Sequence, residues 1–205
     1  MTKRVLGMKE TDSSFQALQA IMEKGLADSS VALSAMSTGG MRLQKPVVHM
    51  LPLDQVPGIA GGPARVVVAV YVGMKGDLSG HLMLLFQREA ALRVVEMLMD
   101  LPPGSLPDLD EVGRSALAEV GNICCSACLS ALANRTGLVI LPTPPVVVTD
   151  MAGAILESVV THLYLNGDES LVVETKFNEE VPGYFLLLPD QQSLGKLVAV
   201  VGTKP

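Results

Sequence analysis

Three polar residues with helical spacing are the part of this sequence best suited to chemistry. Ser115, Glu119 and Asn122 stand at i, i+4 and i+7, so on a helix they fall within about 60° of one another and form one stripe. The Asn122 carboxamide is not a general base, but it can accept a hydrogen bond from a water molecule and donate one, which holds that water at a defined angle. An ordinary solvated helix face would also carry such residues, so the stripe alone fits both interpretations.

The segment that contains this stripe is predicted to be a helix from Asp108 to about Gly137. Asp108 and Glu111 form a D-x-x-E capping box, and Gly137 tolerates the left-handed turn that ends a helix. Residues 123–133 carry no charge, so that half of the helix is expected to be buried on nearly every side.

The stripe and its surroundings are similar to the signature of the CheC/CheX/FliY family. The match consists of Ser115-x-x-x-Glu119-x-x-Asn122, then 22 residues, then Pro145. A chance E-x-x-N on an amphipathic helix would lack the long spacing to the proline. The resemblance covers about residues 12–202 and is strongest to CheC, because the ending FLLLPDQQSLGKLVAVVG also looks like a CheC ending.

The resemblance implies an activity, because these proteins are chemotaxis phosphatases. The expected substrate is an aspartyl phosphate on a CheY-like receiver domain. By this resemblance, Asn122 would orient a water for in-line attack. Glu119 would pair with a receiver lysine, with Ser115 in support. Mg²⁺ is expected on the receiver, and no metal or other cofactor is expected in this chain.

Two other functions stay open. One is a catalytically weak CheC-type adaptor that acts through a CheD-like receptor deamidase. The other, a structural component of a flagellar switch, is less favoured because the chain leaves no room for the switch domain that FliY would add. Of these three functions, only the phosphatase is expected to depend on Asn122.

Gly121 and Pro145 are expected to support the site indirectly. Gly121 costs the helix about 1 kcal/mol relative to Ala, so it should serve a purpose. It either lets a partner backbone approach Asn122 closely or packs under a crossing strand, and both interpretations are kept. Pro145 is expected to shape the strand that follows the helix.

The sequence also repeats itself. Residues 80–98 align with residues 183–201 without a gap. We therefore expect an α+β fold, an internally duplicated single domain with pseudo-twofold symmetry and a mixed or antiparallel sheet flanked by long helices, as in CheC. The predicted organisation is an N-terminal extension at 1–11 and one CheC-like domain at 12–202, made of repeats at about 12–100 and 108–202 with a linker at 101–107.

The same repetition suggests that only the second half carries a site. Aligning VALSAM (31–36) with ACLSAL (127–132) places Glu23 opposite Glu119 and Leu26 opposite Asn122. An isobutyl side chain can neither orient a water nor donate a hydrogen bond. Glu23 and Leu26 are therefore expected to mark a degenerate second site.

The composition of the chain indicates which partners and which cellular location to expect. A net charge of −6, without a basic cluster after residue 4, argues against nucleic acid as a partner. No apolar run reaches the roughly 18 residues that span a bilayer, and the N-terminus lacks a signal-peptide pattern, so a cytoplasmic protein without membrane insertion is expected. Internal pseudo-symmetry favours a monomer.

The cysteines and histidines suggest no second chemistry. Cys124, Cys125 and Cys128 lie on the uncharged half of the predicted helix, where thiols are more often small hydrophobes than metal or redox groups. His49, His81 and His162 all fall in predicted strands and show no metal-ligand spacing. The expected helices are 12–36, 88–99, 108–137 and 190–201, and the expected strands are 41–51, 65–73, 79–86, 138–149, 157–165, 170–177 and 183–188, with a hairpin at Asn166-Gly167.

Overall fold

The computed structural model describes residues 12–37, 40–163 and 169–202. Its elements are α1 (Ser13–Met36), β1 (Val47–Pro52), the 3-10 turn η1 (Leu53–Gln55), α2 (Val56–Ile59), β2 (Val66–Gly76), β3 (Gly80–Gln87), α3 (Arg88–Leu98), α4 (Glu111–Thr136), β4 (Ile140–Pro142), β5 (Val146–Met151), α5 (Ala152–Leu163), β6 (Glu169–Phe177), β7 (Val181–Pro189) and α6 (Gln191–Val201).

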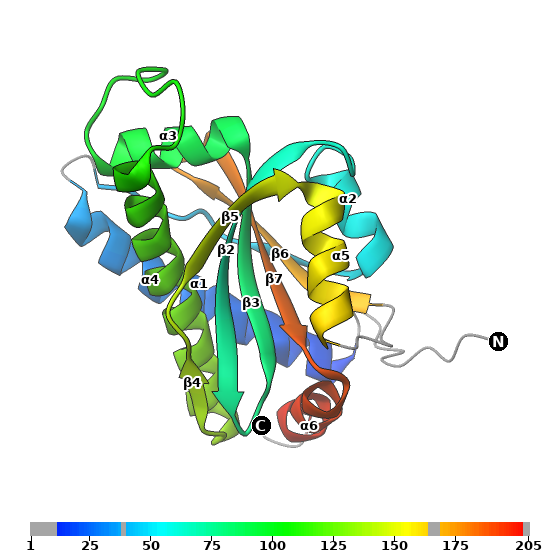
Figure 1. The fold of residues 1–205 in the computed structure, drawn as a ribbon. Helices are drawn as coiled ribbons and strands as arrows, with labels where there is room; N and C mark the ends of the chain where they lie inside the picture. The colour runs from blue at the N-terminus through cyan, green and yellow to red at the C-terminus, as the bar shows by residue number, and fades with distance from the viewer. Residues whose placement is uncertain (1–11, 38–39, 164–168, 203–205) are drawn as a thin grey trace.

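One twisted antiparallel sheet forms the centre of the molecule (Figure 1). Its strand order is β1-β6-β7-β3-β2, and β4 and β5 both pair with the outer edge of β2. The long helices α1 and α4 cover one face together with α3 and α6, whereas α2 and α5 cover the other. The predicted α+β class, with an antiparallel sheet flanked by long helices, is confirmed.

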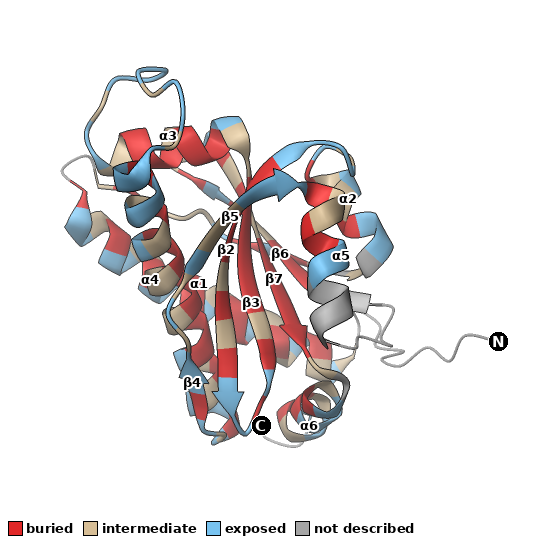
Figure 2. Ribbon diagram, viewed as in Figure 1, coloured by how far each residue is buried: buried red, intermediate tan, exposed pale blue. Residues whose placement is uncertain are grey.

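The alternation of β2 explains why both faces are covered. Successive side chains of a strand point to opposite faces. Val68 and Val70 join the core beneath α4, while Val67 and Ala69 join the core beneath α5. Because this strand is apolar on both faces, helices cover both faces of the sheet at this point, and Figure 2 shows that the strands between them are largely buried.

The middle of the sheet has the symmetry that a duplication predicts. Met83 of β3 pairs with Leu186 of β7, and these two residues are equivalent when 80–98 is aligned with 183–201. A twofold axis through this pair requires that register. The pairing supports our proposal of two related halves, and the boundaries of the repeats remain predictions.

The predicted strand at 157–165 is wrong, because residues 157–163 belong to helix α5, and residues 164–165 lie outside the described residues. Ala152, Ile155 and Leu156 recur at helical spacing and are buried against the sheet. The β-branched run Val159-Val160-Thr161 gave the segment its strand-like composition, and tertiary packing overrode it. The predicted hairpin at Asn166-Gly167 lies outside the described residues.

The predicted strand at 138–149 is interrupted and forms β4 and β5. Between them, Thr143 attaches the chain to β2: its backbone N–H donates to Gly73 O at 2.9 Å, and its Oγ1 accepts from Gly73 N at 2.9 Å. Pro144 and Pro145 follow and cannot donate to a strand ladder. The break therefore lies where prolines interrupt the hydrogen bonding.

The N-cap of helix α4 lies two residues after the N-cap that the capping box predicted. Its N-cap is Asp110, whose Oδ1 accepts from Gly113 N at 2.8 Å. Asp108 instead forms an ion pair with Arg88 at 3.1 Å. The C-terminal prediction is confirmed, since Gly137 has a left-handed φ of 77°.

A buried carboxylate holds the linker that leads into α4. Glu96 on α3 is 1% exposed and accepts from Gly104 N and Leu106 N, each at 3.0 Å, and from Arg93 Nη1 at 2.8 Å. Burial alone raises the pKa of Glu96, but the bonds from Leu106, Arg93 and Gly104 outweigh it and lower the pKa from 4.5 to about 2.

Helix α4 has the length and apolar composition of a membrane span, although half of its most apolar window is buried within the fold. It packs along α1 and against β2, β3 and β4. A core helix of a soluble domain meets the same criterion, so the composition of α4 follows from its place between α1 and the sheet.

Candidate active site on helix α4

The three predicted residues lie together on the outer side of α4. Ser115 and Glu119 are exposed, and Asn122 is half-buried. The opposite side of the helix is buried in the core through Leu117 and Val120. The stripe therefore faces away from the sheet, and the Asn122 side chain is not sealed within the fold.

Gly121 brings this part of α4 close to the sheet. It is buried, and a Cβ at this position would stand 2.3 Å from Val70 Cγ1 on β2. Of the two interpretations of Gly121, the structure therefore favours packing against a strand over close approach by a partner. The glycine sets the distance of the neighbouring Asn122 from the sheet.

Asn122 has a neighbour that the sequence reasoning missed. Ser126, one turn further along α4, donates from its Oγ to Asn122 Oδ1 at 3.4 Å. Ser126 is half-buried, as Asn122 is. The i, i+4 spacing of a hydroxyl after a carboxamide could have indicated this contact.

Arg114 connects the stripe to the neighbouring edge strand. Its guanidinium donates to Val147 O at 3.5 Å and to Thr149 Oγ1 at 3.4 Å, both on β5. These long contacts place β5 along one side of the site helix, as Figure 1 shows. The other side of the stripe is open to solvent at Glu119.

The charge of Glu119 is available to a partner. Among the residues that the structure describes, none forms an ion pair with this carboxylate. The described part of the chain also contains no group of three or more His, Cys, Asp or Glu residues that could hold a metal ion. What the stripe offers is therefore one free anion and one oriented carboxamide.

Sequence and structure comparisons show which known proteins this chain resembles. A family model for the chemotaxis phosphatase CheX matches residues 68–166. The CheY-P phosphatase CheC of Bacillus subtilis (strain 168) is 28% identical over 203 residues, covering 96% of each chain. The crystal structure of Thermotoga maritima FliY, 18% identical, has a TM-score of 0.73 and covers 97% of this chain and 100% of that one. By sequence and fold, this chain is similar to proteins of the CheC/CheX/FliY family.

A further relative of this family shares the fold at lower similarity. The CheX chain in the CheX-CheY-BeF3-Mg²⁺ complex of Borrelia burgdorferi is 21% identical, with a TM-score of 0.51, and covers 82% of this chain and 96% of that one. The predicted resemblance to the CheC/CheX/FliY family is confirmed.

The two long helices of this CheC-like fold bury equivalent positions. The buried pairs are Leu18 and Leu117, Ile21 and Val120, Met22 and Gly121, Gly25 and Cys124, and Leu33 and Leu132. Each helix also ends with a buried hydroxyl that donates to the carbonyl four residues earlier, from Ser37 at 3.2 Å and from Thr136 at 2.7 Å. The structure thus fixes which residues of α1 and α4 correspond.

This register corrects the predicted alignment of the two helices by three residues. Glu23 lies opposite Asn122, and Ala20 lies opposite Glu119. The prediction was wrong because small apolar residues recur every three to four positions, so two helices can be matched in more than one register. The first half therefore lacks both an acid at the position of Glu119 and a carboxamide at the position of Asn122.

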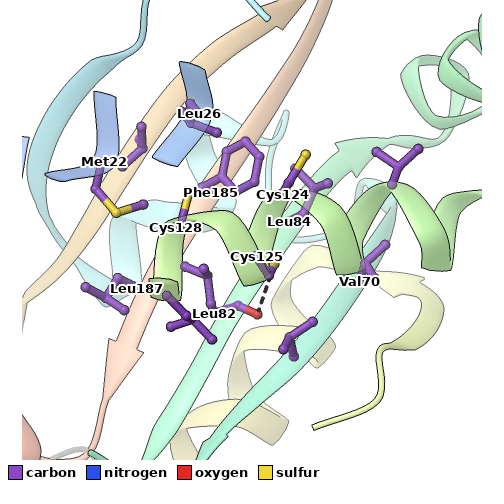
Figure 3. Close-up of a cluster of buried hydrophobic side chains, with 14 of the residues drawn as sticks. Met22, Leu26, Val70, Leu82, Leu84, Cys124, Cys125, Cys128, Phe185 and Leu187 are labelled. Carbon is purple, nitrogen blue, oxygen red and sulfur yellow. Dashed lines mark hydrogen bonds between the residues drawn. The ribbon is translucent and has the colours of Figure 1, made fainter. Parts of the chain in front are cut away.

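Leu26 is not part of a degenerate surface site. It is 1% exposed and packs in the core near Met22 and Phe185 (Figure 3), opposite Cys125 in the corrected register. Glu23 is half-buried and bonded locally. It accepts from Gln19 Nε2 at 3.0 Å, and Lys45 Nζ lies 3.8 Å from its carboxylate. A single site in the second half remains our proposal.

The three cysteines are core residues. Cys124, Cys125 and Cys128 are buried, and Cys125 Sγ donates to Leu82 O at 3.9 Å (Figure 3). Burial raises the pKa of Cys124 to about 12 and raises the pKa values of Cys125 and Cys128 as well. Because the thiolate is the reactive and metal-binding form, these thiols are poorly suited to either role.

The histidines lie apart from the stripe. His49 is in β1 and His81 in β3, whereas His162 falls in helix α5 instead of a strand. His81 lines a cavity of about 340 Å³ with Tyr71 and Asp150 on the α5 face, and the sheet separates this cavity from α4. Burial, with a smaller contribution from Asp150, raises the pKa of Tyr71 to about 12.

Proposed function

We propose that this chain is a protein-aspartyl-phosphate phosphatase that accelerates the dephosphorylation of a CheY-like receiver at a single site on α4. The observation that carries the proposal is the solvent-facing stripe of Ser115, Glu119 and Asn122. It occurs in a chain that is similar over 96% of its length to a CheY-P phosphatase.

In the proposed reaction this chain mainly positions a water and supplies no covalent chemistry. The receiver brings an aspartyl phosphate and its own Mg²⁺, and phosphoryl transfer depends mainly on an aligned water and neutralised charge. Asn122 accepts a hydrogen from the water through Oδ1, so a lone pair of the water oxygen is directed at phosphorus. Such positioning can lower the barrier by several kcal/mol, and about 1.4 kcal/mol changes the rate tenfold.

Glu119 acts as the docking group in this proposal. Its exposed carboxylate carries no ion pair within the described structure, so a receiver lysine can approach it without displacing another cation. Ser115 lies one turn earlier on the same stripe and adds a polar contact at the rim. A charge pair formed on docking would fix the height of Asn122 above the phosphoryl group.

The proposal also implies a partner, a cellular location and an oligomeric state. A CheX relative forms a complex with CheY, BeF3 and Mg²⁺, which supports a receiver of that class as the partner of this chain. We place the protein in the cytoplasm, where such receivers act, and assign it no cofactor of its own. We expect it to act as a monomer.

A phosphate-release assay with a phosphorylated CheY-like receiver tests the proposal. The wild-type chain should shorten the lifetime of the phosphorylated receiver, and Asn122→Ala should return it to nearly the receiver's own rate while binding persists. Asn134→Ala is the matched control, because Asn134 is an exposed asparagine near the other end of the same helix. Glu119→Lys should weaken binding itself.

The adaptor alternative makes a different prediction in the same assay. If the wild-type chain leaves the phosphate lifetime unchanged but forms a complex with a CheD-like deamidase, the adaptor function replaces the phosphatase. In that case Asn122→Ala would have no effect on the lifetime, because there is no acceleration to lose.

A further inference from the structure

We propose that Ser126 is a positioning residue for Asn122, and that its hydroxyl fixes which way the carboxamide faces. The inference rests on the proposed phosphatase function and adds a residue to that site. It is carried by one contact: Ser126 Oγ donates to Asn122 Oδ1 at 3.4 Å across one turn of α4.

A carboxamide needs such a partner because its two ends differ. Rotation by 180° about the last side-chain bond exchanges an oxygen, which only accepts, with an NH₂ group, which only donates. In the proposed mechanism the oxygen must accept a hydrogen from the attacking water. A carboxamide that is free to rotate would spend part of its time with the NH₂ group in that place, where it could not accept.

The hydroxyl of Ser126 favours the productive orientation. A carbonyl oxygen has two lone pairs, so Asn122 Oδ1 can accept from Ser126 with one and from the water with the other. The NH₂ group then points elsewhere and can donate to an oxygen of the phosphoryl group. Ser126 does not touch the substrate in this arrangement and acts only through Asn122.

The first half of the chain offers a comparison. In the register fixed by the buried positions, Ala27 lies opposite Ser126 and Glu23 lies opposite Asn122. A carboxylate has two equivalent oxygens, so it has no end-to-end orientation to fix. The hydroxyl is therefore present in the half that carries a carboxamide and absent from the half that carries a carboxylate.

Variants at Ser126 test the inference in the receiver assay at increasing concentrations of this protein. Ser126→Ala should lower the maximal dephosphorylation rate about 3- to 10-fold, the value of one hydrogen bond, and leave the half-saturating concentration unchanged. Ser126→Thr keeps the hydroxyl and should restore most of the rate. Ser130→Ala is the matched control, because Ser130 is an exposed serine one turn further along α4.

Receiver binding in the Asn122→Ala background separates positioning from general damage to the helix. Asn122→Ala leaves almost no acceleration to lose but keeps binding, so adding Ser126→Ala there should leave the affinity for the receiver unchanged. A wild-type rate in Ser126→Ala overturns the inference and leaves the phosphatase proposal intact. A loss of rate that Ser126→Thr does not restore, or weaker receiver binding by Ser126→Ala in the Asn122→Ala background, also overturns it. A wild-type protein without activity defeats the phosphatase proposal instead.

Discussion

Glu23 on α1 occupies the position that Asn122 occupies on α4. Both are half-buried, and each follows a buried pair of residues that faces the sheet. The acid of the second half, Glu119, is replaced in the first half by Ala20. The two halves thus present the same helix face with different functional groups.

This correspondence predicts that a second site can be installed. Ala20→Glu with Glu23→Asn should restore part of the activity of an Asn122→Ala protein, because the pair then stands at the positions of Glu119 and Asn122. Dephosphorylation of the phosphorylated receiver is the measurement. Glu23→Asn alone is the control and should restore little. If the pair restores nothing, the face of α1 is not accessible to a receiver.

Gly121 and Val70 provide a test of how the site helix is held. Gly121→Ala should destabilise the protein by about 1–3 kcal/mol, because the new Cβ would stand 2.3 Å from Val70 Cγ1. The higher helix propensity of Ala offsets about 1 kcal/mol of this cost. Denaturation by urea, followed by circular dichroism, measures the change.

A compensating variant makes that prediction specific. Val70→Ala should itself cost stability, yet Gly121→Ala should be better tolerated in that background, since the clashing methyl groups are gone. Strictly additive effects of the two substitutions would contradict the contact. If the Gly121→Ala protein folds but has a lower phosphatase rate, the distance of α4 from the sheet matters for the position of Asn122.

Glu96 predicts a pH dependence of stability. Its pKa in the folded protein is lowered to about 2 from an ordinary value of 4.5. A lowered folded-state pKa contributes stability that is complete above the unfolded-state value and is lost as the pH falls from about 4.5 towards 2. Full ionisation therefore adds roughly 3 kcal/mol at neutral pH.

Glu96→Gln removes this contribution and should lower the free energy of unfolding at pH 7 by about 2–4 kcal/mol, since an NH₂ group would face donors from the linker. The difference between variant and wild type should shrink as the pH approaches 2. Glu89→Gln on the same helix is the control, because the Glu89 side chain is 64% exposed and should contribute little. An equal effect of both variants would argue against the linker contacts.

The sequence predicted the features that depend on periodicity. The helix with its solvent-facing stripe was evident from residues 115, 119 and 122, and the strands that line up in the repeat were found close to their observed bounds. Residues 157–163 were misassigned to a strand because the apolar spacing from Ala152 onwards fits a helix while the β-branched residues at 159–161 favour a strand. Only packing against the sheet decides between these two.

Features that depend on the partners of single side chains could not be read from the sequence. Asp108 and Asp110 are both plausible N-caps, and the ion pair of Asp108 with Arg88 leaves Asp110 as the cap. The register of α1 against α4 could be determined only from which residues are buried, since several registers align similar residue types. Ser126 was overlooked because its role depends on a contact with Asn122 that no motif describes.

The break between β4 and β5 has a consequence for how this molecule meets others. An exposed edge strand with regularly spaced N–H groups invites another chain to add to the sheet. Here the outer edge is divided into short strands, and Pro142, Pro144 and Pro145 remove three backbone N–H donors from its middle. The interruption that shapes the side of the site helix thus also discourages strand-by-strand aggregation there.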